Sequence, residues 1–217
     1  MIKLSKPSKM PCLSWSLQAI DTCPGSIDHL TGNLVPACQG CYATTGFYLM
    51  PGTINAREHN RADWKRDSWV ADMVNHLRKQ TYFRWFDSGD VYSVKLARKI
   101  LQVMLSTPHV KHWMPTRMYK FKKFEPVFNS MNALPNVVVR FSSDEIDGAS
   151  IGGRYISVIF DPEQPDQVPS DASICPAYKQ GGKCIDCRAC WNDSVIAYPQ
   201  HGRKMDKVNK MLSLKIA

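Results

Sequence analysis

Hydrophobic residues follow two alternating patterns along most of the chain. Apolar positions spaced three and four residues apart indicate amphipathic helices, whereas short β-branched or aromatic runs indicate strands. The predicted helices span 56–79, 94–105, 121–131 and 205–216, and the predicted strands span 82–86, 110–114, 137–141, 156–160 and 195–198.

This alternation predicts right-handed βαβ units that build a parallel sheet, and therefore an α/β fold. The strands are apolar nearly throughout, as expected when both faces of the sheet are covered. Five or six strands are too few for a closed eight-stranded barrel, so we expect an incomplete (β/α) barrel or an open doubly wound sheet. Within one α/β domain we expect a cysteine-rich N-terminal loop region at 1–55, a βα core at 56–165, a cysteine-rich loop at 166–194, and a last strand and helix at 195–217.

Polar residues follow every predicted strand. The carboxyl ends of parallel strands form the working edge of such sheets, so these residues predict a ligand-binding rim. The alternative is that they are ordinary turn formers, because Asp, Ser and Gly favour turns in any loop. The rim comprises Asp87, Ser88, Gly89 and Asp90, then Thr116 and Arg117, then residues 142–145, then Asp161, and finally His201 and Gly202.

Eight cysteines gather near the two ends of the chain, a number that would also suit a disulfide framework. However, the chain has 217 residues, of which 44% are hydrophobic, so it can bury a core without disulfides. Its first 15 residues lack the apolar stretch of a signal peptide, and no apolar run is long enough to span a membrane. We therefore expect reduced thiols, a cytoplasmic location and no membrane partner.

The C-terminal cysteines have the spacing C-x8-C-x2-C-x2-C. A close triplet with one remote cysteine is a familiar way to bind a [4Fe-4S] cluster, whereas zinc sites more often pair two distant C-x2-C hooks. The pattern favours iron–sulfur over zinc. The expected ligands are Cys175, Cys184, Cys187 and Cys190.

The N-terminal cysteines leave more alternatives open. Cys38 and Cys41 form a C-x2-C hook, and Cys12 and Cys23 could complete a four-thiolate site with it. A single site could instead draw ligands from both ends of the chain. Cys12 or Cys23 could also be a buried apolar thiol, which is common in proteins. The sequence therefore predicts one or two [4Fe-4S] clusters.

The chain is basic, with a formal net charge of +9 and a pI near 9.2. Such a charge suits a polyanionic partner such as nucleic acid. A four-thiolate cluster would offset part of it, because that cluster adds negative charge. The basic residues are dispersed, so we expect weak, nonspecific binding of nucleic acid only.

Several segments, in the same order, resemble the phage family called gene product eighty-eight: KMPCLSWSLQAIDTCPGS, CQGCYATTGFY, RWFDSGDVYS, MPTRMYK, VVVRFSSDE, CPAYKQGGKCIDCRACW and VIAYPQHG. That family is similar to radical S-adenosylmethionine (SAM) enzymes, which build a partial barrel with an N-terminal cluster. The resemblance implies that Cys41 is the last ligand of that cluster. It also implies that Ser88, Gly89 and Asp90 contact the SAM amino group, and that the C-terminal cysteines form an auxiliary site.

The spacing departs from the pattern of those enzymes, which is usually C-x3-C-x2-C and leaves one iron free for SAM. Here fourteen residues separate Cys23 from Cys38, and Cys12 could close the fourth position. The sequence therefore favours a non-catalytic iron–sulfur protein that acts on an unknown host or phage macromolecule. Two alternatives stay open, a radical SAM-type enzyme and a zinc-stapled nucleic-acid-binding protein.

Overall fold

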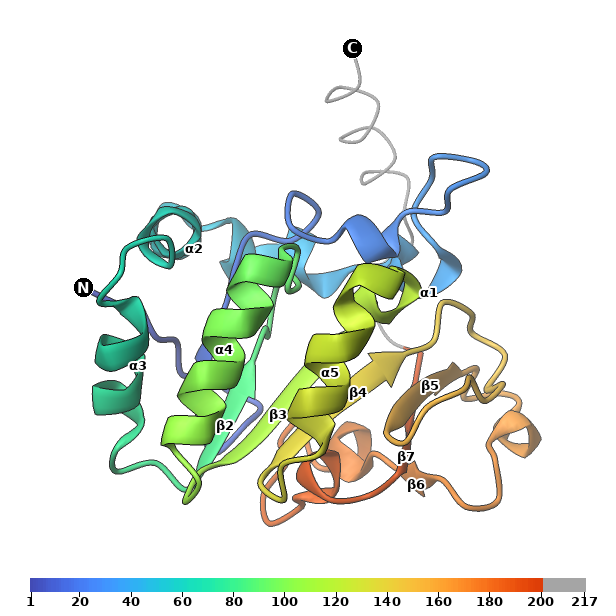
Figure 1. Cartoon of the computed structure of the whole chain (residues 1–217). Helices are drawn as coiled ribbons and strands as arrows, with labels where there is room; N and C mark the ends of the chain where they lie inside the picture. The colour runs from blue at the N-terminus through green and yellow to red at the C-terminus, as the bar shows by residue number, and fades with distance from the viewer. Residues whose placement is uncertain (201–217) are drawn as a thin grey trace.

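A single parallel β-sheet of seven strands organises the protein. A computed structural model describes residues 1–200, and the strands lie in the order β1-β2-β3-β4-β5-β7-β6 (Figure 1). Every pair of neighbouring strands is parallel. Within the described residues, the edge strands β1 and β6 do not pair with each other, so the sheet is open. The strands are β1 (Leu13–Trp15), β2 (Tyr82–Trp85), β3 (Lys111–Thr116), β4 (Val137–Ser142), β5 (Ile156–Phe160), β6 (Ser173–Ile174) and β7 (Val195–Pro199).

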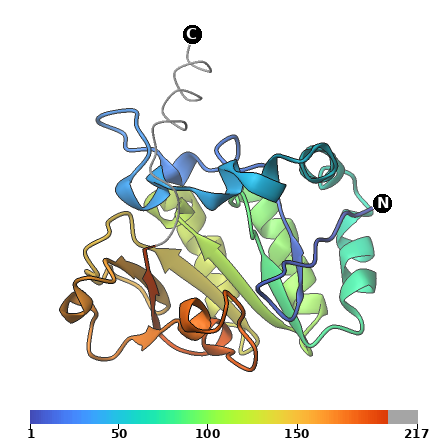
Figure 2. The ribbon, with the colours of Figure 1, turned by 180° about the vertical axis from the view of Figure 1, so that it is seen from behind.

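Helices α3, α4 and α5 cover one face of the sheet, whereas irregular segments from both ends of the chain lie over the other (Figures 1 and 2). This arrangement matches an incomplete α/β barrel and not the doubly wound alternative, which would need helices on both faces. The α-helices are α1 (Pro36–Gln39), α2 (Pro51–Asp63), α3 (Trp69–Leu77), α4 (Val94–Ser106) and α5 (Glu125–Asn132). The short 3-10 helices are η1 (Pro24–Ser26), η2 (Tyr42–Thr44), η3 (Gly46–Leu49), η4 (Met118–Lys120), η5 (Lys122–Phe124), η6 (Pro165–Gln167), η7 (Pro176–Lys179) and η8 (Ala189–Trp191).

The main hydrophobic core lies between the sheet and helices α3, α4 and α5. Trp15, Trp69 and Trp85 are fully buried in it, and the Trp15 ring meets the other two rings edge-on at centroid distances of 5.4 and 6.1 Å. Edge-to-face packing adds to the large apolar area that each of these rings buries. The core therefore joins β1, β2 and α3, elements that lie far apart in the sequence.

Two of the predicted helices differ from the structure, and two strands were not predicted. The expected helix over 56–79 is two helices, α2 and α3, separated by a bend at residues 64–68. The helix expected over 121–131 begins only at Glu125, with Pro126 in its first turn, where proline's missing N–H costs no hydrogen bond. Strands β1 and β6 were not predicted, because they have only three and two residues. The helix expected over 205–216, His201 and Gly202 lie outside the described residues.

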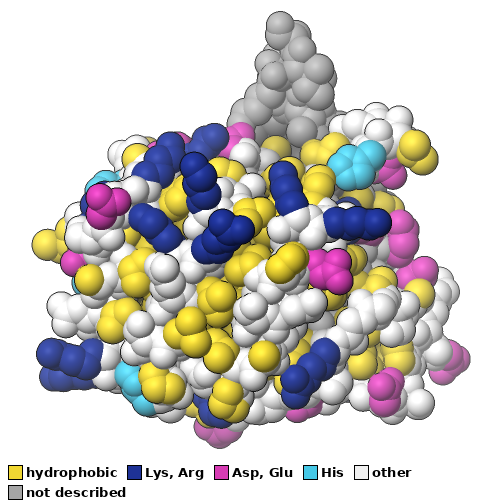
Figure 3. All heavy atoms as spheres, viewed as in Figure 1, with side chains coloured by type: hydrophobic (Ala, Val, Ile, Leu, Met, Phe, Trp, Pro, Cys, Tyr) yellow, Lys and Arg dark blue, Asp and Glu magenta, His cyan; other side chains and the backbone are white. Residues whose placement is uncertain are grey.

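Basic side chains are spread over the face that α4 and α5 cover. Figure 3 shows Lys and Arg mainly along its upper edge, separated from one another by uncharged and apolar side chains. Within residues 1–200, no helix has the length and apolar character needed to cross a membrane.

Candidate functional site

A cavity of about 500 Å³ lies on the face of the sheet that the helices leave free. Side chains alternate along a strand, so Phe83 and Trp85 of β2 enter the main core while Arg84 between them faces the cavity. The other strands contribute in the same way: Trp113, Ser157 and Tyr198 line the cavity from β3, β5 and β7. The strands therefore form one wall of the cavity, and the cysteine-rich loops form the rest.

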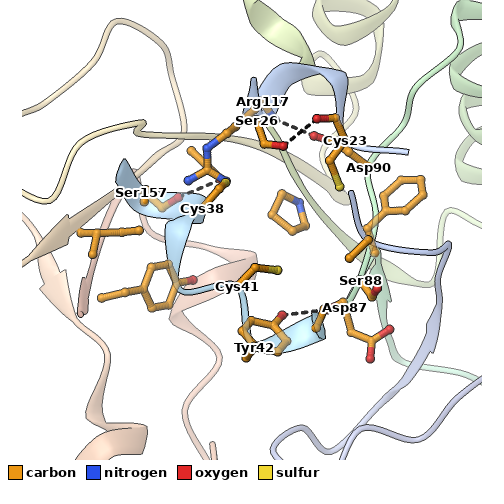
Figure 4. A pocket seen from close by; sticks show the side chains of 18 of the residues that line it. Cys23, Ser26, Cys38, Cys41, Tyr42, Asp87, Ser88, Asp90, Arg117 and Ser157 are labelled. Carbon is orange, nitrogen blue, oxygen red and sulfur yellow. Dashed lines mark hydrogen bonds between the residues drawn. The ribbon is translucent and has the colours of Figure 1, made fainter. Parts of the chain in front are cut away.

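Three N-terminal thiols surround one end of this cavity. Cys23, Cys38 and Cys41 all line it, and Figure 4 shows their side chains directed around the same space. Cys38 precedes Cys41 in a turn in which the Cys41 N–H donates to the Cys38 carbonyl at 3.2 Å. Cys23 comes from the preceding loop, at the start of η1. Three thiols that are loosely spaced in the sequence thus lie around the same end of the cavity.

The loop that holds these thiols is fixed to the carboxyl ends of three strands. After β2, the Tyr42 hydroxyl donates to the Asp87 carbonyl at 2.7 Å. After β4, the Ala37 N–H donates to the Asp144 carbonyl at 2.8 Å. After β3, Gly25 packs so closely that an added Cβ would lie 2.6 Å from the Arg117 carbonyl oxygen. The cysteine loop is therefore positioned by the rim that the sequence predicted.

Burial keeps these thiols protonated while they hold no metal. It raises the pKa of Cys23, Cys38 and Cys41, and the nearby carboxylate of Asp90 raises that of Cys23 further. The Arg117 guanidinium opposes this effect at Cys38. A metal must displace protons from such thiols, so metal affinity should weaken in acid.

The Asp90 carboxylate is already fully engaged inside the protein. It accepts hydrogen bonds from Thr116 Oγ1 at 2.7 Å, from the Arg117 N–H at 2.8 Å and from the Val91 N–H at 2.7 Å. Burial raises its pKa, while these donors oppose the shift. Asp90 lines the cavity, but its main structural effect is to tie the loop after β2 to the end of β3.

Ser88 and Gly89 also serve the packing of the loop after β2. The Ser88 hydroxyl donates to the Leu17 carbonyl at 2.8 Å. Gly89 has φ +75°, and an added Cβ would lie 2.5 Å from Thr22 Oγ1. Both residues line the cavity, and the Ser88–Gly89–Asp90 segment lies on the side of it where Asp90 neighbours Cys23 (Figure 4). Its glycine is required by conformation and by close approach.

Some of the remaining rim residues line the cavity, and Asp144 holds one of the lining residues in place. Thr116, Arg117 and Ser142 line the cavity, whereas Asp161 does not. Asp144 forms ion pairs with Arg117 at 3.2 Å and with Lys120 at 2.6 Å. Arg117 is thereby held beside Cys38.

The C-terminal thiols lie at another part of the same cavity. Cys175, Cys184 and Cys190 line it, and Cys187 follows Cys184 in a turn closed by a 2.8 Å backbone hydrogen bond. The Cys190 sulfur lies 3.1 Å from the Tyr198 hydroxyl. Burial raises the pKa of Cys190 to about 11, and the Tyr198 hydrogen bond opposes that shift.

Cys12 belongs to this C-terminal group and not to the N-terminal one. It is buried in a cluster with Met10, Trp113 and Trp191, against which Cys184 and Cys190 pack. Burial raises its pKa to about 11, and the neighbouring Cys184 thiol adds to the rise, although Arg84 lowers it. The four-thiolate N-terminal site that the sequence allowed is therefore not assembled.

All eight cysteines are free thiols. Within residues 1–200, no group of three or more His, Cys, Asp or Glu side chains is arranged so that it could hold a metal ion.

Sequence reasoning did not single out several side chains of the cavity. Arg84, Trp113, Ser157 and Tyr198 lie within strands, where an apolar run had suggested simple burial. The signal that could have found them is alternation, because a lone Arg between Phe83 and Trp85 must face away from the core.

The chain was compared with protein-family models, curated proteins and solved structures. No curated protein and no solved structure matches it. The model of one family, described as Gene product 88, matches residues 2–193. That match covers both cysteine groups, the whole cavity wall up to β6 and the loop after β2. The chain therefore belongs to the Gene product 88 family, a family of phage gene products.

Proposed function

We propose that this protein is an iron–sulfur enzyme of the radical SAM type, with a [4Fe-4S] cluster on Cys23, Cys38 and Cys41. The observation that carries the proposal is the separation of Cys12 from these three thiols. Three cysteine ligands leave one of four irons without a protein thiolate. A cluster closed by a fourth cysteine, which the sequence had favoured, would have no such position.

When bound, such a cluster supplies an iron at which the amino and carboxylate groups of SAM chelate, and an electron for cleaving it. The chain's own residues provide the surroundings. The cavity of about 500 Å³ has the size of small-molecule sites, which run to roughly 300–1,000 Å³. Ser157 and Ser142 offer hydroxyls in its wall, and the Gly89 backbone passes beside it. These groups would orient a ligand and exclude water from it.

Two partly buried polar contacts would keep the thiol loop in place during turnover. Tyr42 follows Cys41 directly and is bonded to the end of β2, while Arg117 is held beside Cys38 by its ion pair with Asp144. Both are positioning residues, since they act on the loop that carries the thiols. Because thiols stay reduced there, we place the action of the enzyme in the host cytoplasm, on a substrate of host or phage origin.

The test is anaerobic purification followed by iron, sulfide and zinc analysis and by reaction with SAM under dithionite. We expect brown protein with broad absorbance that bleaches on reduction, together with 5′-deoxyadenosine well above the no-protein control. Cys41→Ala should abolish its formation. Cys12→Ala is the matched control, and it should retain SAM cleavage, because Cys12 lies in the other thiol group.

Three outcomes would contradict the proposal. Colourless protein with stoichiometric zinc would favour the zinc-stapled alternative. Loss of SAM cleavage in Cys12→Ala, with the melting temperature unchanged, would mean that Cys12 completes the N-terminal site. Brown protein that never cleaves SAM would favour a non-catalytic cluster protein.

A further inference from the structure

Two arginines on the cavity side of the sheet form no ion pair within residues 1–200. Arg140 of β4 is fully buried. Arg84 of β2 is half-buried, lines the cavity and lies on the same side of the sheet, with β3 between them. The Nε atoms of both are buried and without a hydrogen-bond partner. A buried charge without a counter-charge is costly, above all for Arg140.

Arg140 holds the loop that carries Cys190. Its Nη2 donates to the carbonyls of Cys190 at 3.2 Å and Asp193 at 2.6 Å. Its Nη1 donates to the carbonyls of Ile156 at 2.7 Å and Ser194 at 3.0 Å. Carbonyl oxygens satisfy the hydrogen bonds of the guanidinium but do not neutralise its charge. Burial accordingly lowers the pKa of Arg140, although Tyr198 and Cys190 oppose that effect.

Arg84 lines the cavity together with Cys184 and Cys190. Its guanidinium stacks on the Trp113 ring at 4.6 Å and donates to the Met10 sulfur at 3.2 Å. Burial acts to lower its pKa, but Tyr42, Asp87 and Tyr198 together raise it. The acid that influences Arg84 is Asp87, but this carboxylate already pairs with Arg57 at 3.9 Å and accepts from Tyr48.

We propose that Arg84 and Arg140 are the counter-charges of a second iron–sulfur cluster, bound by Cys175, Cys184, Cys187 and Cys190. Four thiolates and a [4Fe-4S] core carry a net negative charge, which would neutralise both guanidiniums. The two arginines then set the reduction potential of this cluster, because a nearby positive charge favours the more negative, reduced form. The inference shares with the proposed function only the premise that the thiols bind iron, and it concerns a different site.

The experiment uses full-length protein carrying Cys41→Ala, so that the remaining iron belongs to the C-terminal site. A redox titration with dithionite, followed by electron paramagnetic resonance, then measures the midpoint potential for uptake of one electron. We expect Arg84→Gln and Arg140→Gln each to lower the equilibrium constant for reduction about tenfold, which is about 59 mV for one electron. Arg140→Lys keeps the charge and should restore most of the potential.

Arg154→Gln is the matched control. Arg154 lies over the Tyr155 ring at 5.1 Å, as Arg140 does at 5.9 Å, but its side chain is exposed to solvent. Its removal should leave the potential unchanged. If Arg140→Gln loses the cluster, Arg84→Gln and Arg140→Lys still decide the question.

Unchanged potentials in both glutamine variants with the cluster retained would overturn the inference. So would a Cys41→Ala protein that holds no iron, because the C-terminal thiols would then bind no cluster. The proposed function is judged separately, since it depends on SAM cleavage by the unmodified protein and its loss in Cys41→Ala.

Discussion

The two faces of the sheet are stabilised in different ways. On the helix side, α3, α4 and α5 bury a continuous set of apolar side chains, and the buried His112 has partners on both ring nitrogens. On the cavity side, thiols of both cysteine groups and the guanidiniums of Arg84 and Arg117 line one space. The helix side is held together by apolar packing, whereas the cavity side gathers polar and titratable groups.

The largest difference between the faces should follow metal removal. The loops at 1–50 and 166–194 contain short 3-10 helices and little regular structure, so iron bound as we propose would add to their order. We expect chelation of the iron to make both loops sensitive to trypsin, while residues 69–142 stay resistant. Mass spectrometry of the fragments gives the cut sites. Equal protection of the loops with and without metal would contradict the comparison.

A cavity in the helix side should cost stability and leave metal binding alone. Phe128 of α5 is 1% exposed and stacks on Phe124 at a centroid distance of 5.4 Å. We expect Phe128→Ala to lower the free energy of unfolding by about 3–5 kcal/mol. Iron per folded chain should not change. Urea unfolding measures the first quantity, and metal analysis the second.

Leu105→Ala on α4 is the control for that substitution. Leu105 is 55% exposed, so its truncation should change stability by less than about 0.5 kcal/mol. A comparable loss in both variants would mean that the helix side is not the tightly packed face.

The sequence predicts those elements whose apolar pattern is contained in a few neighbouring residues, and it misses features that depend on specific side-chain contacts. The strand at 137–141 and the core face of α3 were predicted because their apolar patterns are local. The break between α2 and α3 was not, since the apolar stripe at 70–77 lies wholly within α3 and the turn at 64–68 depends on local contacts such as Arg66 with Asp63 at 2.7 Å.

The site was predictable in its residue types but not in its grouping. All eight cysteines were expected ligands, and six line the cavity. The partner of Cys12 could not be read from spacing, because its neighbour Cys184 lies far along the sequence, after strands β1 to β6. Arg140 lies within the apolar run VVVRF, which does not reveal that its guanidinium is buried. Its acceptors, such as the Ser194 carbonyl beside β7, are far away in the sequence.

The buried histidine of the helix side gives a smaller effect, which depends on pH. Trp85 Nε1 donates to His112 Nδ1 at 3.3 Å, so the proton lies on Nε2, which donates to Thr107 Oγ1 at 2.9 Å. Burial lowers the pKa of His112 to about 3. Between this value and its ordinary value near 6.5, the unfolded chain binds a proton that the folded chain excludes. Stability should therefore fall as the pH drops below 6.5.

From this group alone we expect a loss of about 2 kcal/mol between pH 8 and pH 5. Urea unfolding at the two pH values measures it in the wild type and in His112→Gln, with His109→Gln as the exposed control. The difference between the two pH values should shrink by that amount in His112→Gln only. An unchanged pH dependence in that variant would show that His112 titrates alike in the folded and unfolded chains.

The smallest effect concerns the surface outside the cavity. The net charge of +9 favours polyanions, and on the helix side the basic side chains lie mainly along the upper edge, with uncharged and apolar side chains between them (Figure 3). Lys122 and Lys123 of η5, just before α5, are two exposed basic residues. We expect weak binding to RNA or DNA of any sequence, with a log affinity that falls linearly with log salt. Lys122→Gln with Lys123→Gln should reduce the slope by less than about 2, and a filter-binding series over salt concentration measures it. Tight, sequence-selective binding at physiological salt would instead assign the helix side to a nucleic-acid partner. The helix side would then have a binding function as well as the cavity side, and the two faces would differ less than we infer.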